Sequence, residues 1–321
     1  MNNDLSAAID FVSSKATDPF QRYIITNEIL RQSPSDGEAE ALYQSKWYRQ
    51  LADEQFDNGS WGRFHSMDAR IKDRLKFVST EGALRRARDL GLSRSDPMMQ
   101  KSLALMQRYL RKEEQWPDYT EKHHDNGKSF MVAFPFLIAA NLSLFDPQNE
   151  LLHEKREICL NMLAKAFKSG SFDEQIWEQD NRDYSGCCLR AWMVYPLWLL
   201  QGADELSADL ERQYLNYIWH RAEGIYYISK NAPAVKYHLE DKGFTTWLLA
   251  LEALSGFSLF AEFMADDVFE HLLGEVNRLM AGAVKLPPAH AITGHYAESW
   301  RNRGVRECDL IIRILRLLVR C

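Results

Sequence analysis

Carboxylate and imidazole side chains gather in short stretches of this sequence, and these residue types could together perform acid–base chemistry. The first stretch holds His65, Asp68 and Glu81. Four further stretches carry similar groups: Asp118, His123, His124 and Asp125; Asp180, Asp183 and Tyr184; His238, Glu240 and Asp241; and His290, His295 and Glu298. If several of these groups meet in one dry cavity, shifted pKa values and proton transfer are expected. The competing interpretation is that each residue only caps a neighbouring helix.

Each stretch follows a corner between two helical patterns, and the clearest corner is 54–68. The residues Asp57-Asn58-Gly59-Ser60 have the composition of a sharp turn. Gly59 and Gly62 allow a close backbone approach or a positive φ, and Trp61 between them is large enough to pack against a neighbouring element. The corner therefore joins two helices at a sharp reversal of the chain.

This corner recurs along the chain at a nearly constant interval. Aromatic residues mark it at Trp61, Trp116, Phe172 and Tyr226, which are 54 to 56 residues apart. A fixed interval of this size indicates one repeated structural unit. The Gly-containing stretch 282–300 is interpreted as a degenerate fifth corner.

The segments between the corners are predicted to be helical, so the expected fold class is all-α. Apolar residues recur at helical spacing in 4–14, 19–31, 36–54, 80–90, a helix starting at 97, 129–145, 146–168, 173–201, 207–221, 237–256, 266–280 and 305–321. The almost uniformly apolar segments are expected to lie inside the molecule. Pro135 and Pro196 are expected to kink the helices that contain them.

The residues Gln55 to Gly62, with the sequence QFDNGSWG, resemble the Gln-Trp repeat of the terpenoid cyclase and protein prenyltransferase superfamily. In that superfamily, a Gln followed by Gly-x-Trp joins consecutive helices of a double-ring toroid. The resemblance implies an α/α toroid, a double ring of about six helical hairpins, with residues 1–321 forming a single domain. The N- and C-terminal helices are expected to close the ring, because otherwise two hairpin faces would stay exposed to water.

The resemblance also implies that an isoprenoid or another small apolar ligand binds in a central cavity and undergoes acid catalysis there. The Asp-x-Asp-Asp acid of class II terpenoid cyclases occurs nowhere in the sequence. The string 266–270 superficially fits a magnesium–diphosphate motif, but its place at a helix start favours capping. Glu307-Cys308-Asp309 lacks the Asp-x-Cys spacing of a prenyltransferase zinc site. No metal ion and no cofactor are therefore expected, and the sequence leaves enzymatic activity open.

Residues directly after the corners of such a ring lie at the mouth of its cavity, and they supply the candidate site. The candidate catalytic residues are Asp68, His65, Glu81 and Asp241. The candidate substrate-binding residues are Trp61, Asp118, His124, Asp125, Tyr184, His238 and His295.

Two other classes of function fit the same residues. The density of Asp, His, Tyr and Trp after the corners favours a carbohydrate-active hydrolase or lyase on the related six-hairpin (α/α)6 barrel, where paired carboxylates or a Tyr-His couple cleave a glycosidic bond. The missing acid motif favours a ring that has kept its scaffold without catalysis and binds a ligand or a protein partner.

Composition narrows the set of partners and compartments. The formal net charge of −6 gives no electrostatic reason to expect nucleic acid as a partner. Five cysteines without Cys-x-x-Cys spacing favour reduced thiols and a cytoplasmic location. The longest apolar run, 131–145, is too short to span a bilayer, so no integral membrane segment is expected.

Basic residues collect on one face of the expected C-terminal helix. Arg313, Arg316 and Arg320 accompany an apolar stripe that includes Leu310 and Ile314. This pattern is compatible with a peripheral membrane contact and also with docking of the helix on its own ring.

Overall fold

The computed structural model describes residues 3–118, 128–185, 189–264, 267–287 and 294–321, and it confirms the all-α fold class. No β-strand occurs in these residues. The helices are α1 (Asn3–Lys15), α2 (Pro19–Ile24), the π-helical turn η1 (Ile25–Ile29), α3 (Asp36–Gln44), α4 (Lys46–Glu54), α5 (Thr80–Asp89), α6 (Pro97–Leu110), α7 (Lys128–Ser143), the 3₁₀ turn η3 (Glu150–Leu152), α8 (His153–Ala166), α9 (Glu174–Ser185), α10 (Val194–Leu200), α11 (Ala208–His220), α12 (Phe244–Leu254), α13 (Phe260–Met264), α14 (Asp267–Met280) and α15 (Arg303–Leu318).

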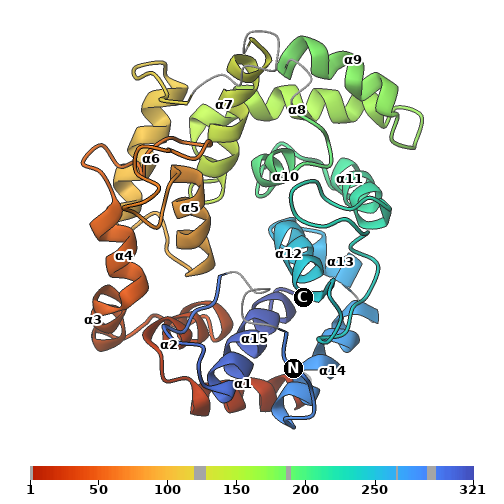
Figure 1. The fold of residues 1–321 in the computed structure, drawn as a ribbon. Coiled ribbons are helices and arrows are strands. Elements are labelled where there is room, and N and C mark those ends of the chain that lie inside the picture. Colours follow the sequence, from red (N-terminus) through yellow and green to blue (C-terminus); the bar gives the residue numbers. More distant parts are fainter. Residues whose placement is uncertain (1–2, 119–127, 186–188, 265–266, 288–293) are drawn as a thin grey trace.

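The helices follow one another around a ring, as Figure 1 shows. Helix α1 packs against both α14 and α15, so the two ends of the chain meet. The junction also includes a buried hydrogen bond of 2.5 Å from Gln21 Nε2 to Asp309 Oδ1. Asp309 accepts further hydrogen bonds from the backbone of Tyr296 and from Trp300 Nε1. The carboxylate therefore holds three separate segments together.

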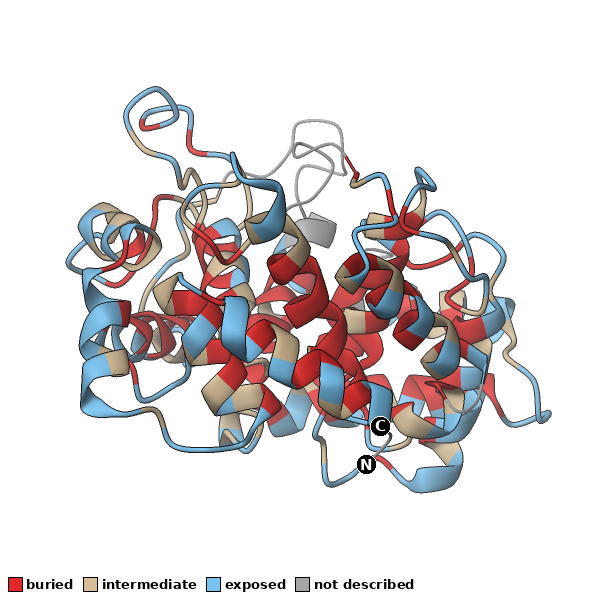
Figure 2. Cartoon of the chain, turned by 90° about the horizontal axis from the view of Figure 1, so that it is seen from below, coloured by how far each residue is buried: buried red, intermediate tan, exposed pale blue. Residues whose placement is uncertain are grey.

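Helices α5, α10, α12 and α15 surround the middle of the ring (Figure 1), and the buried residues concentrate in the interior (Figure 2). Every residue of α10 is buried, and α10 packs extensively against α7. In α7, Phe134 and Ile138 are fully buried. The two segments with almost uniformly apolar sequences therefore lie inside, because neither has a polar face to present to water.

The Gln-Trp corner joins α4 to the segment before α5 through both of its signature side chains. Trp61 is fully buried, and its Nε1 donates to the carbonyl oxygen of Leu51 at 2.8 Å. Gln55 Nε2 donates to Ser102 Oγ in α6 at 2.9 Å. Gly59 has φ +94°, and a Cβ atom there would lie 2.4 Å from the carbonyl oxygen of Lys101. Only glycine fits this position without displacing the α6 backbone.

Several details of the predicted helices are wrong. The helix expected over 173–201 is two helices, α9 and α10, with residues 189–193 outside both, and the helix expected from 146 begins as α8 at His153 after the turn η3. The single helix expected over 36–54 is broken at Ser45, whose Oγ donates to the carbonyl of Leu42 and accepts from the amide of Tyr48, so that it ends α3 and caps α4. Pro196 is the third residue of α10 and lies in its first turn, where proline is tolerated and no kink is needed. The helix expected from 237 begins at Phe244.

The C-terminal helix α15 docks on the protein itself. It packs against α1, α14 and α12, and ten of its residues are buried. Among the described residues, every helix is too short or too polar to cross a bilayer.

Candidate functional site

The side chains of His65, Glu81 and Tyr195 converge next to the middle of the ring, and we call them the His65–Glu81–Tyr195 cluster. His65 Nδ1 lies 2.7 Å from Glu81 Oε2. Tyr195 Oη donates to Glu81 Oε1 at 2.9 Å and lies 3.3 Å from His65 Nδ1. Glu81 and Tyr195 are buried, whereas a third of the His65 side chain is exposed. A buried carboxylate is thus connected to one buried hydroxyl and one accessible imidazole.

Three elements position this cluster. His65 lies in the loop after the Gln-Trp corner, and the carboxylate of Asp118 holds that loop by accepting from the backbone amides of Phe64 and His65, each at 2.9 Å. Glu81 is in the first turn of α5, which Ser79 caps by accepting from the amide of Gly82. Tyr195 is in the first turn of α10.

The environment of Tyr195 keeps its hydroxyl protonated. Burial and the charge of Glu81 raise the pKa of the Tyr195 hydroxyl well above its usual value of 10. The phenolate would be both desolvated and next to a carboxylate, so at neutral pH Tyr195 donates its proton to the hydrogen bond with Glu81. In chemical terms it is a hydrogen-bond donor to Glu81, which is a general-base candidate.

A cavity of about 140 Å³ lies between α5, α10, α12 and α15, and we call it the arginine cavity. Five arginines line it, together with two carboxylates, Asp89 and Glu252. The arginines are Arg85 and Arg88 from α5, Arg313 and Arg316 from α15, and Arg320 just after α15. Among the residues that line the cavity, positive charge is therefore in excess.

Four of these arginines lie within ion-pair distance of a carboxylate: Arg85 of Glu81, Arg313 of Glu252, and both Arg316 and Arg320 of Glu28. Arg313 binds both carboxylate oxygens of Glu252, with Nη2 at 2.7 Å from Oε2. Burial acts to raise the pKa of Glu252, but the charge and hydrogen bond of Arg313, together with the charges of Arg316 and Arg88, outweigh this effect and the pKa is lowered. Arg316 forms a two-pronged ion pair with Glu28 at 2.9 and 2.7 Å and also donates to Tyr296 Oη at 2.9 Å. Such bidentate pairs fix the guanidinium planes in space.

Arg88 has no carboxylate within ion-pair distance among the described residues. Its closest polar contact is from Nη2 to the carbonyl oxygen of Glu252, at 3.5 Å, and its guanidinium lies 5.6 Å from the ring centre of Trp198. Burial lowers the pKa of Arg88 to about 10. The guanidinium still carries its charge at neutral pH, so its local environment favours an anion beside it.

Arg85 connects the arginine cavity to the His65–Glu81–Tyr195 cluster. Its guanidinium lies 5.9 Å from the ring centre of Trp198, and its Nη2 is 3.9 Å from Glu81 Oε1.

Tyr227, on the rim of the cavity, has φ +70° and is 64% exposed. A non-glycine residue held in the left-handed region is uncommon, and such strain concentrates at functional sites.

The sequence prediction placed two members of the cluster, His65 and Glu81, among the candidate catalytic residues, and the structure brings these two together. Asp68 lies apart from them and is buried. Its Oδ1 accepts from Arg70 Nε at 2.8 Å, and this hydrogen bond lowers the pKa of Asp68 to about 2. Asp241 is exposed and accepts from the backbone amide of His238 at 2.8 Å, as a turn-capping residue does.

The predicted substrate-binding residues are dispersed. Trp61 is enclosed at its corner, and Asp118 holds the 64–66 loop. Tyr184 is exposed on α9, and His238 contacts α14 through Glu275. His295 is half-buried, and its ring centre lies 5.2 Å from that of Trp47 and 4.9 Å from that of Trp300. His124 and Asp125 lie outside the described residues, as do His123 and His290.

Sequence reasoning missed Tyr195 and the arginines of α5. Tyr195 lies in an apolar run that was assigned to the core. The spacing of Arg85 and Arg88 on one face of α5, opposite the buried Ala83 and Ala87, was the available signal.

The chain matches no protein-family model, no curated protein and no solved structure.

Proposed function

We propose that the protein binds a small anionic ligand in the arginine cavity and performs acid–base chemistry on it with the His65–Glu81–Tyr195 cluster. The observation that carries this proposal is the half-buried Arg88, which has no carboxylate within ion-pair distance among the described residues, whereas the other four arginines of the cavity each have one. An anion beside Arg88 would satisfy the guanidinium donors and offset the cost of burying its charge.

The size of the arginine cavity limits the ligand. Sites for drug-sized ligands usually enclose about 300–1,000 Å³, whereas this cavity encloses about 140 Å³. An inorganic anion or a small organic acid fits this volume, and a long apolar chain does not. A prenyl diphosphate, the ligand type suggested by the Gln-Trp resemblance, would have to place its phosphates among the arginines and its chain outside the cavity.

The cluster supplies groups for moving one proton. Glu81 accepts the proton, Tyr195 Oη holds the Glu81 carboxylate through a hydrogen bond, and the accessible His65, 2.7 Å from Glu81, exchanges the proton with solvent. Arg85, which contacts Glu81 at 3.9 Å and lines the cavity, orients the anion toward these groups.

A second candidate is a carbohydrate-active enzyme that acts on an acidic sugar. It is favoured by the 3.3 Å separation of Tyr195 Oη and His65 Nδ1, together with the Trp198 ring in the cavity wall. Aromatic faces pack against sugar rings, and an arginine would hold the sugar carboxylate.

The proposal is tested by calorimetric titration with phosphate, diphosphate, citrate, glucuronate, farnesyl diphosphate and uncharged farnesol. We expect an anion to bind, farnesol not to bind, and Arg88→Met to weaken anion binding at least tenfold. Arg212→Met is the matched control, because Arg212 is an exposed arginine of α11 that pairs with Glu262. Preferential binding of glucuronate would favour the second candidate.

Two outcomes would overturn the proposal. One is that no anion of the panel binds at millimolar concentration. The other is that Arg88→Met and Arg212→Met bind the anion equally well.

We also propose a cytoplasmic location, because the buried thiols of Cys159 and Cys308 are unpaired cysteines.

A further inference from the structure

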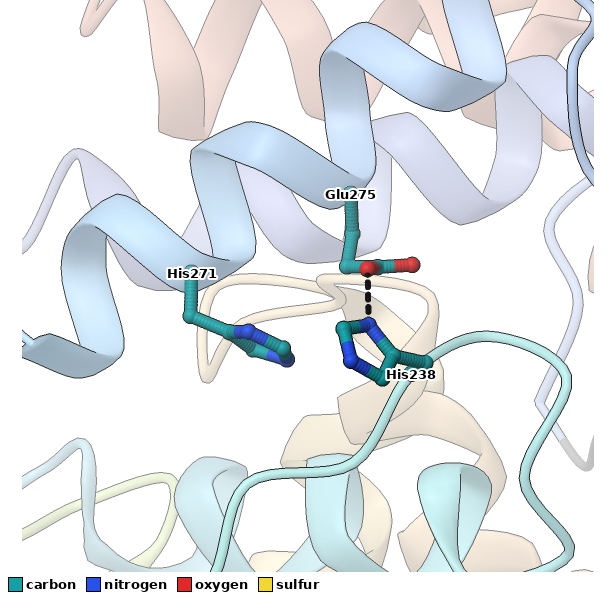
Figure 3. A group of neighbouring side chains, drawn as sticks. All are labelled: His238, His271 and Glu275. Carbon is teal, nitrogen blue, oxygen red and sulfur yellow. Dashed lines mark hydrogen bonds and ion pairs between the residues drawn. The ribbon is translucent and has the colours of Figure 1, made fainter.

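A second group of side chains lies between α14 and the loop 221–243, away from the residues that line the arginine cavity. Figure 3 shows His238 from this loop facing His271 and Glu275 of α14. Each residue offers one ligand atom, and these atoms all lie within 4.8 Å of one another. We propose that His238, His271 and Glu275 bind a divalent transition-metal ion, zinc in the first place, which ties the loop to α14.

The sequence places two of the ligands on one face of α14. His271 and Glu275 are four residues apart, so they project from the same side of the helix, one turn from each other. Glu275 is buried, His271 is half-buried and His238 is exposed. The side chains thus surround a point at the edge of the protein that an ion can reach from solvent.

The separations need only a small adjustment for zinc. Tetrahedral zinc with bonds of 2.0–2.1 Å holds its ligand atoms about 3.4 Å apart. The three atoms are at most 4.8 Å apart, and rotation of the exposed His238 side chain, 62% of which is accessible, can close this distance. A water molecule would complete the tetrahedron, as in zinc sites with three protein ligands.

A hydrogen bond already present fixes the tautomer of one of the two imidazoles, that of His271. His271 Nε2 lies 2.8 Å from the carbonyl oxygen of Tyr237. A carbonyl oxygen can only accept, so Nε2 carries the proton and Nδ1 of the neutral ring keeps its lone pair. Metal-bound histidines commonly donate their other N–H to a backbone carbonyl in this way.

Glu275 is held in place by donors that do not belong to the proposed ligand set. Arg278 Nη1 donates to both carboxylate oxygens at 2.7 and 2.8 Å, and the amide of Leu239 donates to Oε2 at 3.1 Å. His238 Nδ1 lies 2.7 Å from Oε1, and a metal ion would take over this contact. Two imidazoles and one carboxylate suit zinc, copper, nickel or cobalt and not magnesium or calcium, which prefer oxygen ligands only.

Metal binding would brace the rim of the arginine cavity. The loop 221–243 carries Tyr227 and Ile228, which line that cavity, and it is joined to α14 at Tyr237, His238 and Leu239. A metal ion bound between His238 and α14 would restrict the movement of the loop 221–243 and thereby hold Tyr227 and Ile228 in place at the cavity.

The direct test is calorimetric titration of the full chain with zinc chloride after treatment with a chelator. The Cys321→Ser background removes the one thiol that is exposed among the described residues, because this thiol could bind zinc by itself. We expect one zinc ion per chain, and at least about 100-fold weaker binding in His271→Ala and in His238→Ala, since losing even an outer-shell partner commonly costs 10- to 100-fold. His238 is exposed, so its replacement is expected to leave the fold intact.

His153→Ala provides the matched control. His153 forms a hydrogen-bonded pair with Glu205 on the surface, as His238 does with Glu275, but it lies in no three-residue group of this kind among the described residues. This variant should bind zinc as tightly as the parent. Zinc at 100 times its dissociation constant should raise the melting temperature of the parent by roughly 4 °C and leave that of His238→Ala unchanged.

Three results would overturn the proposal: no saturable zinc binding by the parent, zinc binding unaffected by His238→Ala and His271→Ala, or equal weakening in His153→Ala. In the supporting case, cobalt bound in place of zinc gives a visible absorption spectrum of a four-coordinate ion without a thiolate charge-transfer band.

Discussion

At the scale of single residues, the arginines at the centre of the molecule differ in how they are paired. Arg313 neutralises Glu252, so Arg313→Met would leave a carboxylate uncompensated and should lower the free energy of unfolding by about 3–5 kcal/mol. Arg88 has no such partner, so Arg88→Met should raise the free energy of unfolding by about 1 kcal/mol, because a desolvated charge is removed. Urea unfolding of both variants measures these changes.

The two variants are expected to change the free energy of unfolding in opposite directions, Arg313→Met lowering it and Arg88→Met raising it. If Arg88→Met destabilised the protein as much as Arg313→Met, Arg88 would have to be fully compensated in the unliganded protein. Arg88 would then need no anion beside it, and the arginine cavity would not be expected to bind one.

A second prediction at this scale concerns the pH dependence of stability. Burial and the charges of Arg86, Lys76 and Lys46 lower the pKa of His295 from 6.5 to about 4. The unfolded chain therefore binds this proton more tightly than the folded protein does. Stability should fall as the pH drops from 6.5 to 4, by up to about 2 kcal/mol after allowance for solvent screening of a half-exposed ring.

The measurement compares the parent with His295→Phe, which keeps an aromatic ring between Trp47 and Trp300. Burial raises the pKa of Asp18 to about 6, which gives a contribution of opposite sign in the same pH range. Subtracting the two urea-unfolding curves at each pH removes that contribution. Parallel pH profiles for the two proteins would contradict the prediction.

From the sequence, the candidate site could be predicted only at positions where an ionisable side chain follows a turn. His65 and Glu81 were identifiable because a carboxylate and an imidazole follow a turn. Tyr195 was not, since a tyrosine within an apolar run has the pattern of core packing. The arginines of α15 were recognised as one polar stripe, but periodicity does not tell whether a stripe faces solvent, a membrane or a cavity.

At the scale of the helices and corners, two glycines with similar backbone angles allow a matched comparison. Gly59 and Gly170 have φ +94° and +89°. A Cβ at Gly59 would lie 2.4 Å from the carbonyl oxygen of Lys101, whereas a Cβ at Gly170 would meet nothing within 4 Å. Gly170→Ala should cost only the backbone strain, about 1–2 kcal/mol, and Gly59→Ala at least about 2 kcal/mol more.

Thermal and urea unfolding of the two variants give the comparison directly. Equal losses would mean that the close approach of the first corner to α6 contributes nothing, and that the corner is held by Gln55 and Trp61 alone.

Helices were predictable from periodicity, and their ends were not. The break at Ser45 was hidden because the apolar spacing continues across it while a single hydroxyl serves both helix ends. The corners also differ more than their spacing indicates: Trp61 is fully buried, Trp116 and Phe172 are half-buried, and Tyr226 is exposed. A sequence interval does not record how deeply each aromatic is covered.

At the scale of the whole molecule, the contact of α1 with α14 and α15 should be essential to stability. Val12 is fully buried on α1, and Val12→Asp should cost at least about 3 kcal/mol, because it places an unpaired carboxylate in this interface. Ala7→Asp, on the exposed face of the same helix, should cost less than about 1 kcal/mol. Tryptophan fluorescence during urea unfolding measures both values, and equal effects would show that α1 contributes little to the fold.

Because the two ends of the chain pack against each other, α1 must wait during translation until α14 and α15 have been synthesised. Helix α1 has Leu5, Ala8, Ile9 and Val12 on its buried face, and its partners α14 and α15 lie more than 250 residues further along. At about 5–20 residues per second, translation delivers α15 roughly 15–60 s after α1. Throughout that interval the nascent N-terminal segment exposes the apolar surface that α14 and α15 later cover, so this segment is where a chaperone would bind the unfinished polypeptide.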